Sequence, residues 1–327
     1  MNNFYTLIHK VSFWMLLVFV SSFVIRVILM LDPNKRVYNH TPGPCRVLTD
    51  QFNGSSGLEY VPSLNAVLFT YGMGKASFAW EKSGIGLYEV HKDEKTQNKH
   101  VIKKMNLDLK NFDKSKFAPG GISSYTTQGR THIYVVNTHP SKRCIVFFML
   151  VKNTLVLQKT LCDVGFTSLH DLVAVGPDKF FFTNRVYFNN PFLQLFEFIM
   201  QSNTGTLYFY DGHTASVAIP SLPSPGPLAY DSKRRKLYVG SMINEVIKVY
   251  DVKNDFSLSH KNIRGPSQVL RVRMQEDGIS WVITEPYAND GATISSGSAV
   301  VFAEDQMVVG SAYGRLLHCD VLNPQIT

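Results

Sequence analysis

The residues Asp171–Thr183, which read DLVAVGPDKFFFT, carry the pattern that decides the fold. An apolar stretch is followed by a polar turn and by a second apolar stretch that ends in a small residue. The same pattern returns at Pro227–Gly240 (PLAYDSKRRKLYVG) and at Ala299–Gly310 (AVVFAEDQMVVG), and a further strand follows each time. Four-stranded units that repeat at a spacing of roughly fifty residues are typical of β-propeller blades. An ordinary β-sandwich would not explain this repetition.

Short strands separated by turn residues continue on both sides of this repeat, from Glu59 to Val321. Long helical patterns are nearly absent from this part of the sequence. We therefore predict an all-β fold in which residues 45–321 form a β-propeller of four-stranded blades. About five units can be distinguished, and they begin near Leu58, Gly121, Leu172, Pro227 and Val269.

The composition excludes a disordered chain and leaves ample material for a core. Of the 327 residues, 45% are hydrophobic and 18% are charged, and the 15 Tyr and 22 Phe favour strands. The net charge of +8 comes from 33 basic and 25 acidic residues, and lysines accumulate between residues 92 and 116. We interpret this lysine cluster as a solvated hairpin, with an acidic membrane or protein partner as the alternative.

A long apolar stretch lies near the start of the chain. Residues 11–31 contain one charged residue, Arg26, and the stretch ends at Asp32-Pro33. About twenty apolar residues can cross a bilayer as a helix, and an arginine near the end can extend to the headgroups. A cleaved signal peptide ending near Ser22 is the alternative. Because the apolar residues continue beyond Ser22, we expect an uncleaved transmembrane signal anchor.

This anchor sets the expected organisation of the chain. Residues 1–10 would be a cytoplasmic N-terminus, residues 11–31 the anchor and residues 32–44 a linker. The propeller would occupy residues 45–321, and residues 322–327 would form a C-terminal tail.

Two features after the anchor indicate the compartment. Asn39 and Asn53 each begin a glycosylation sequon, and Cys45 lies between them. A bridge from Cys45 to Cys319 would require an oxidising compartment. We infer a single-pass type II membrane protein of the endoplasmic reticulum or cell surface, with its body in the lumen or outside the cell. Nucleic acid is then not expected as a partner.

Two further cysteines lie in one predicted hairpin. Cys144 and Cys162 are placed symmetrically about Asn153, in a segment that turns at Lys152-Asn153. They could therefore face each other across two strands. A cross-strand disulfide and a pair of reduced buried thiols both remain open at this point.

Several motifs in the propeller resemble the serum paraoxonase/arylesterase family. Residues 169–188 (LHDLVAVGPDKFFFTNRVYF) are similar to the N-D-I-V-A-V-G-P block of that family and to the T-N-x-x-Y-F that follows it. Residues 119–123 (PGGIS) resemble its P-H-G-I-S, and residues 135–140 (VVNTHP) resemble its V-V-N-H-P. Residues 54–59 (GSSGLE) stand in the place of its G-S-E-D-L/I-E. The blocks keep their order through most of residues 45–321.

The resemblance implies a calcium-containing propeller, usually with six blades, closed by a disulfide that here would join Cys45 and Cys319. It also implies that the N-terminal apolar segment is retained. The family's next block after residue 258 has no counterpart before Ser267. We therefore expect one blade to be eroded, so that five units remain readable.

The calcium ligands that the resemblance implies are mostly missing. Ser56-Gly57 stand where the family has an adjacent Glu and Asp, and His170 stands where it has Asn. Pro225–Leu228 supply no amide side chain. Asp171 and the carbonyl of Ile122 remain as matched ligands, whereas calcium takes six to eight oxygens. No cofactor is therefore expected, and calcium held weakly by Asp171 and Ile122 is the alternative.

The catalytic base of the family is also altered. The histidine of P-H-G-I-S is Gly120 here, and His139 remains as a weak candidate, shifted by the inserted Thr138. A lone histidine is more often structural than catalytic, because a base must also be positioned by a partner. Asp171 without companion carboxylates is most simply a hydrogen-bond acceptor.

An apolar segment, residues 191–200 (PFLQLFEFIM), follows the T-N-R-V-Y-F block and is interrupted only by Gln194 and Glu197. The equivalent insertion in the family is an amphipathic helix that can contact lipid or substrate. Here it would either pack into the core as a short helix or expose a patch for a membrane or a partner. The residues of this expected patch are Phe192, Leu193, Leu195, Phe196, Phe198, Ile199 and Met200.

We therefore predict a catalytically inactive, membrane-anchored paraoxonase-like protein that serves another membrane protein as a chaperone, assembly factor or accessory subunit. This chain resembles membrane-anchored paraoxonase-like proteins that support degenerin/epithelial sodium channels. The resemblance implies such a channel as the client. The alternative is a calcium-dependent arylesterase or lactonase with a site rearranged around Asp171 and His139. A third hypothesis is a receptor for a lipophilic small molecule in the former active-site tunnel.

Overall fold

The computed structural model describes most of the chain. The residues that it describes are 2–31, 41–49, 52, 54–72, 83–90, 102–110, 112–241, 243, 246–261, 269–274, 281–288, 297–303, 305–311 and 316–322. The expected glycosylation sites Asn39 and Asn53 lie outside these residues. The chain divides into two compact units, Met1–Val37 and Tyr38–Thr327.

The described residues of the first unit form one helix, α1 (Asn2–Leu31). It contains neither Gly nor Pro, and Pro33 follows shortly after its end. The segment Tyr5–Leu29 is long and apolar enough to cross a membrane as a single span, by length and composition. This agrees with the expected apolar helix, which the structure extends toward the N-terminus.

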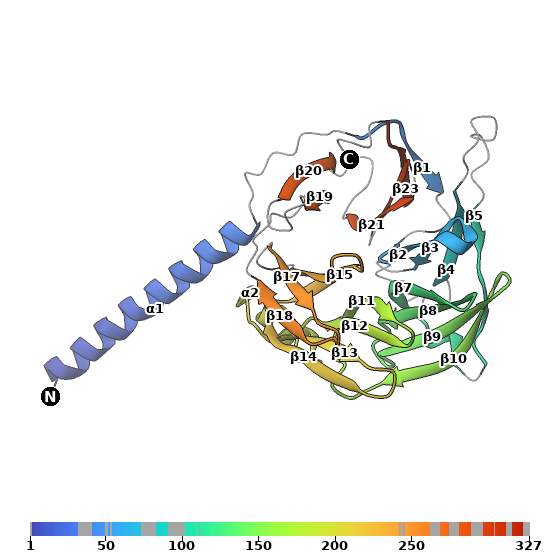
Figure 1. Cartoon of the computed structure of the whole chain (residues 1–327). Coiled ribbons are helices and arrows are strands. Elements are labelled where there is room, and N and C mark those ends of the chain that lie inside the picture. Colours follow the sequence, from blue (N-terminus) through green and yellow to red (C-terminus); the bar gives the residue numbers. More distant parts are fainter. Residues whose placement is uncertain are drawn as a thin grey trace. The chain divides into compact units, whose positions relative to one another are not determined.

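The second unit is a β-propeller, whose sheets are arranged around a common centre (Figure 1). The first blade contains β2 (Leu58–Val61), β3 (Ala66–Tyr71), β4 (Gly84–Glu89) and β5 (Ile102–Lys104). The second contains β7 (Pro119–Thr127), β8 (Arg130–Asn137), β9 (Cys144–Val151) and β10 (Thr154–Cys162), with β6 (Asn106–Asp108) parallel to β10 at its edge. Two short 3-10 helices, at Pro62–Leu64 and Lys114–Lys116, lie in the connections.

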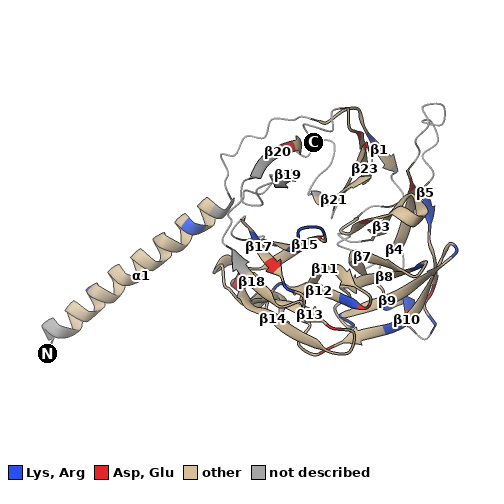
Figure 2. Cartoon of the chain, in the orientation of Figure 1, with Lys and Arg blue, Asp and Glu red and all other residues tan. Residues whose placement is uncertain are grey.

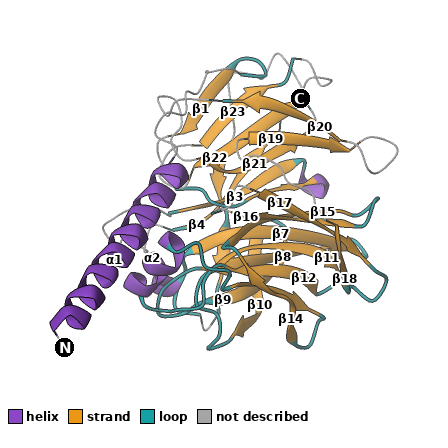
Figure 3. Ribbon diagram, turned by 90° about the vertical axis from the view of Figure 1, so that its left-hand side faces the viewer, coloured by secondary structure: helices purple, strands orange, loops and turns teal. Residues whose placement is uncertain are grey.

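The third blade contains β11 (Leu169–Gly176), β12 (Lys179–Asn184), β13 (Gly205–Tyr210) and β14 (Ala215–Leu222), and helix α2 (Pro191–Ile199) lies between β12 and β13. The fourth contains β15 (Pro225–Asp231), β16 (Lys236–Ser241), β17 (Val246–Val252) and β18 (Leu258–Lys261). Figure 3 shows α2 among the loops at one end of the strands.

The ring closes with a blade built from both ends of the propeller. It contains β21 (Gly297–Ala303), β22 (Gln306–Ser311), β23 (Leu316–Asp320) and β1 (Cys45–Thr49), in the order β1-β23-β22-β21. Between the fourth and the closing blade lies a two-stranded sheet of β19 (Val269–Met274) and β20 (Trp281–Tyr287). Within the described residues, the structure thus confirms an all-β fold with five blades of four strands, and the fifth of these begins at Gly297 rather than near Val269.

The core consists of apolar clusters between neighbouring blades, because alternate side chains of a strand point to opposite faces of its sheet. Phe180 and Phe182 pack toward the second blade with Tyr134 and Phe147. Phe181, between them, packs on the other face with side chains of the fourth blade. The run of three phenylalanines in the opening motif therefore joins three blades.

Charged residues of both signs are interspersed over the strands and hairpins of the propeller (Figure 2). Several form ion pairs, such as Lys236 with Asp251 at 2.6 Å and Arg234 with Asp231 at 3.0 Å. Residues 92–101 of the lysine cluster lie outside the described residues, and the lysines that the structure describes are exposed: Lys103, Lys104, Lys110, Lys114 and Lys116. This distribution is that of a solvated surface.

Candidate functional site

The positions where the family resemblance implies calcium ligands lie on the inner strands of neighbouring blades. Gly57 directly precedes β2, Ile122 lies on β7, Asp171 lies on β11 and Leu228 lies on β15. These strands contact one another in the order β2, β7, β11, β15 around the ring (Figure 1). The fold therefore brings the residues of the expected calcium site to one central region.

Asp171 is held at this centre by backbone groups of two blades. Its Oδ1 accepts a hydrogen bond from the backbone N–H of Leu172 at 2.9 Å, and its Oδ2 accepts one from the N–H of Leu228 at 2.9 Å. Enclosure by the surrounding strands raises the pKa of Asp171 to about 6, although these two hydrogen bonds act in the opposite direction. Both carboxylate oxygens are therefore directed at N–H donors.

One position of the family's adjacent acid pair, Gly57, is closed by the backbone of the next blade. A Cβ atom at Gly57 would lie 2.4 Å from the carbonyl oxygen of Gly120, so the structure has no space for a side chain there. At the neighbouring family position, His170 has its pKa lowered to about 4, by burial and then by the charge of Arg185. A neutral imidazole beside a guanidinium offers calcium no oxygen.

The donor set therefore does not fit a calcium ion. Among the residues that the structure describes, no group of three His, Cys, Asp or Glu side chains is placed to hold a metal. The oxygens of Asp171 already receive two N–H donors, whose positive ends would face a bound cation.

The centre also contains a carboxyl that the sequence reading did not single out. Glu59 lies on β2, and its Oε1 accepts hydrogen bonds from the N–H and the hydroxyl of Ser124, both at 2.7 Å. Burial raises the pKa of Glu59 to about 7, and the charge of Asp171 adds to this effect. The residue ends the G-S-S-G-L-E motif, but the motif alone does not indicate that Glu59 lies near Asp171.

The candidate base His139 lies in the loop after β8. Its Nδ1 contacts the hydroxyl of Ser141 at 2.9 Å, and its charged neighbours are Lys116, Asp113 and Arg143. Burial and the charge of Lys116 lower its pKa. His139 thus belongs to a basic loop, whereas Asp171 lies on an inner strand.

The four cysteines form two disulfides. Cys45 and Cys319 face each other across β1 and β23, with 4.0 Å between their Cα atoms, and the bond closes the ring. Cys144 and Cys162 are cross-strand partners on β9 and β10, with a Cα–Cα distance of 4.3 Å. The second pair, which the sequence left open, is therefore a disulfide.

Helix α2 exposes its apolar side chains and buries a charged one. Glu197 is 2% exposed and accepts hydrogen bonds from the N–H groups of Tyr187 and Phe188, both at 3.2 Å. The amide of Gln194 donates to the carbonyl of Phe188 at 2.9 Å. Asn190 caps the helix by accepting from the N–H of Phe192 at 2.9 Å. The polar side chains of this segment thus form hydrogen bonds with backbone groups of the same segment.

The exposed apolar residues around this helix form one group, which we call the α2 patch: Tyr187, Phe188, Phe192, Leu193, Leu195 and Phe196. Phe192 is 75% exposed and Tyr187 is 69% exposed. Of the residues expected in the patch, Phe198, Ile199 and Met200 are instead half-buried. Tyr187 and Phe188 were missed, because they belong to the T-N-R-V-Y-F block, which reads as the end of a strand.

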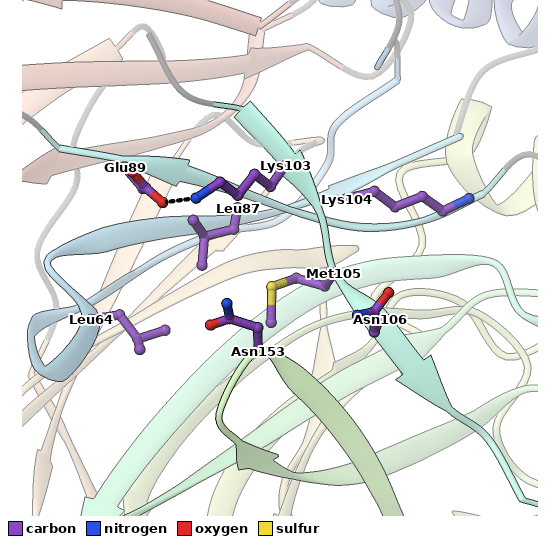
Figure 4. Close-up of a pocket in the computed structure, with 8 residues that line it drawn as sticks. All are labelled: Leu64, Leu87, Glu89, Lys103, Lys104, Met105, Asn106 and Asn153. Atoms are coloured by element: carbon purple, nitrogen blue, oxygen red, sulfur yellow. Dashed lines mark hydrogen bonds and ion pairs between the residues drawn. The ribbon is translucent and has the colours of Figure 1, made fainter.

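A pocket of about 450 Å³ lies on the outer side of the ring, where the chain passes from β5 to β6 (Figure 4). It is lined by Leu64, Leu87, Glu89, Lys103, Lys104, Met105, Asn106 and Asn153. Glu89 forms an ion pair with Lys103 at 2.5 Å, and the lining contains no Ser, Cys or His and no second carboxylate. The pocket therefore lies away from the central residues and has no catalytic grouping.

Comparison with known proteins connects these features to one family. The family model described as Arylesterase matches residues 20–264 and 257–321. The two matched segments overlap at residues 257–264, directly before the two-stranded sheet of β19 and β20. The match to the family model is therefore interrupted where the sequence predicts the eroded blade.

Mechanosensory abnormality protein 6 of Caenorhabditis elegans is 41% identical to this chain, and the match covers 98% of this chain and 97% of that protein. Serum paraoxonase/arylesterase 2 of Homo sapiens is 23% identical, covering 85% of this chain and 88% of that protein. A gluconolactonase from Xanthomonas campestris has a similar fold, with a TM-score of 0.51 at 12% identity, over 88% of this chain and 99% of that one. The chain therefore belongs to the arylesterase family, in a divergent branch together with Mechanosensory abnormality protein 6.

Proposed function

We propose that this chain is a catalytically silent arylesterase-family protein that serves another membrane protein as a chaperone, assembly factor or accessory subunit. The α2 patch is its docking surface. The observation that carries the proposal is the orientation of α2, which buries Glu197 and exposes Phe192 and Phe196. A surface helix ordinarily does the reverse, and exposed apolar patches of this kind mark interaction sites.

Further observations support a client in the membrane. The N-terminal helix is consistent with a single span, which would keep the propeller beside a bilayer. The two disulfides suit an oxidising compartment, which supports our proposal of a type II orientation with a luminal or extracellular propeller. The relative at 41% identity has a name that refers to mechanosensory abnormality. We take the client to be a channel of the degenerin/epithelial sodium channel class.

Co-expression with such a channel tests this proposal. We expect the full-length chain to raise the amount of channel at the cell surface, and the double variant Phe192→Ser/Phe196→Ser to lose this effect. Val217→Ser is the matched control, because Val217 is an exposed apolar side chain on β14, 52% exposed and outside the α2 patch.

Two results would contradict different parts of the proposal. If the wild-type chain leaves the surface amount of channel unchanged, the client is wrong. If the α2 variant has the near-ultraviolet circular dichroism of the wild type and still supports the channel fully, the docking surface is wrong.

The second candidate is a calcium-dependent arylesterase or lactonase, which the relative named serum paraoxonase/arylesterase 2 favours. Against it stand the two N–H donors on Asp171 and the closed position at Gly57. Turnover of phenyl acetate or a lactone, measured across a calcium titration, separates the candidates. Calcium-dependent turnover that Asp171→Ala abolishes would replace the first proposal with the second.

A further inference from the structure

The threonines near the ends of β3 and β12 make the same contact between neighbouring blades. The hydroxyl of Thr70 donates to the carbonyl of Gly120 on β7 at 2.9 Å and accepts from the N–H of Gly57 at 3.0 Å. Thr70 is fully buried, so this hydrogen-bonded connection is shielded from water. It joins the first blade to the second.

The connection is repeated two blades further along the ring. The hydroxyl of Thr183 donates to the carbonyl of Gly226 on β15 at 2.9 Å and accepts from the N–H of Asp171 at 3.2 Å. Thr183 is also fully buried. In both places a backbone N–H donates to the threonine hydroxyl, which donates to a backbone carbonyl. The second of these connections joins the third blade to the fourth.

Asp171 reinforces the second connection. Its carboxylate receives the N–H of Leu172 in its own blade and the N–H of Leu228 in the next blade. The inner strands also approach closely, since a Cβ at Gly121 would lie 2.3 Å from Oδ1 of Asp171. The carboxylate that the family resemblance implies as a calcium ligand is therefore engaged by protein N–H groups of two blades.

We infer that this propeller is held together around its centre by a protein-only clasp of Thr70, Thr183 and Asp171, and that it folds and stays folded independently of calcium. Each member of the clasp links two blades through buried hydrogen bonds. Removing one partner of such a bond leaves the other buried and unsatisfied, which destabilises the fold more than the bond itself contributes.

The first experiment is thermal unfolding of the full-length chain in detergent, followed by near-ultraviolet circular dichroism, in excess calcium and in excess EGTA. We expect the same unfolding midpoint in both. Isothermal titration with calcium chloride accompanies it, and we expect no binding heat. A midpoint that falls in EGTA, or saturable calcium binding, would overturn the inference without the need for any variant.

Variants test the clasp itself. Thr70→Val and Thr183→Val keep the shape of the side chain and remove the hydroxyl, and we expect each to lower the midpoint by a few degrees, equally in both buffers. Thr160→Val is the matched control, because Thr160 is an exposed strand threonine, and we expect it to leave the midpoint unchanged. Midpoints of the two clasp variants equal to that of the control would refute the clasp.

Asp171→Asn distinguishes a clasp residue from a metal ligand. The amide keeps one oxygen acceptor but places an NH₂ group opposite one of the two N–H donors. If Asp171 is a clasp residue, Asp171→Asn lowers the unfolding midpoint equally in calcium and in EGTA. If Asp171 is a residual calcium ligand, the variant lowers the unfolding midpoint in calcium only, and that result would contradict the inference.

Discussion

The contribution of the ring-closing disulfide to the free energy of unfolding can be predicted from the length of chain that it closes. Cys45 and Cys319 are 274 residues apart in the sequence, whereas Cys144 and Cys162 are 18 residues apart. In the chain-entropy account, a cross-link stabilises by restricting the unfolded chain, and the effect grows with the logarithm of the loop it closes. The closing bond should therefore contribute about 5–6 kcal/mol and the hairpin bond about 3 kcal/mol.

The matched double variants Cys45→Ala/Cys319→Ala and Cys144→Ala/Cys162→Ala test this difference. Each pair contains one buried cysteine, Cys319 at 0% and Cys144 at 1% exposed, and one more accessible partner, so each double variant removes one buried sulfur. Urea unfolding of the full-length protein, followed by circular dichroism, gives the two free energies of unfolding. We expect the ring-opened variant to be the less stable by about 2 kcal/mol. Equal stability, or the reverse order, would refute the argument that this bond closes the ring against the entropy of the whole propeller.

Three further predictions concern single residues. The pKa of Glu59 in the folded protein, about 7, lies above its usual 4.5, so the stabilisation from its retained proton is complete below about pH 4.5 and is lost as pH rises through 7. In urea unfolding across this pH range, Glu59→Gln should reduce the decline in the free energy of unfolding by about 3 kcal/mol. The same decline in the variant as in the wild type would contradict the raised pKa of Glu59. Phe181→Ala should cost about 3–5 kcal/mol in the same assay, because Phe181 is fully buried between two blades, and a loss below about 1 kcal/mol would contradict that packing. Asn190→Ala should lower the stability of the α2 segment by about 1 kcal/mol, seen as faster amide exchange from Phe192 to Phe196, whereas unchanged exchange would mean that the cap is dispensable.

The propeller could be predicted because its information is local and repeated. The motif beginning at Asp171 recurs at Pro227 and Ala299, and each copy contains a complete hairpin whose apolar residues alternate between two faces. The mismatch with the family's calcium ligands was also readable, because it depends on residue types at matched positions such as Gly57 and His170.

The clasp and the exposure of the α2 patch could not be predicted from the amino-acid sequence. Thr70 and Gly120 are 50 residues apart, and nothing in either residue type signals that they meet. For α2, the sequence showed an apolar helix interrupted by Gln194 and Glu197, and such a carboxylate ordinarily faces water. Its burial depends on the path of the preceding loop, which presents the N–H groups of Tyr187 and Phe188 to Glu197.

The most direct test of the proposed function is site-specific photo-crosslinking in intact cells that contain the channel. A photoreactive amino acid at Phe192 lies in the α2 patch, and one at Thr160 serves as an exposed control elsewhere on the propeller. We predict a discrete adduct with a channel subunit from position 192 and none from position 160. Adducts of equal yield from both positions, or none from position 192, would contradict the claim that the α2 patch docks a membrane-protein client.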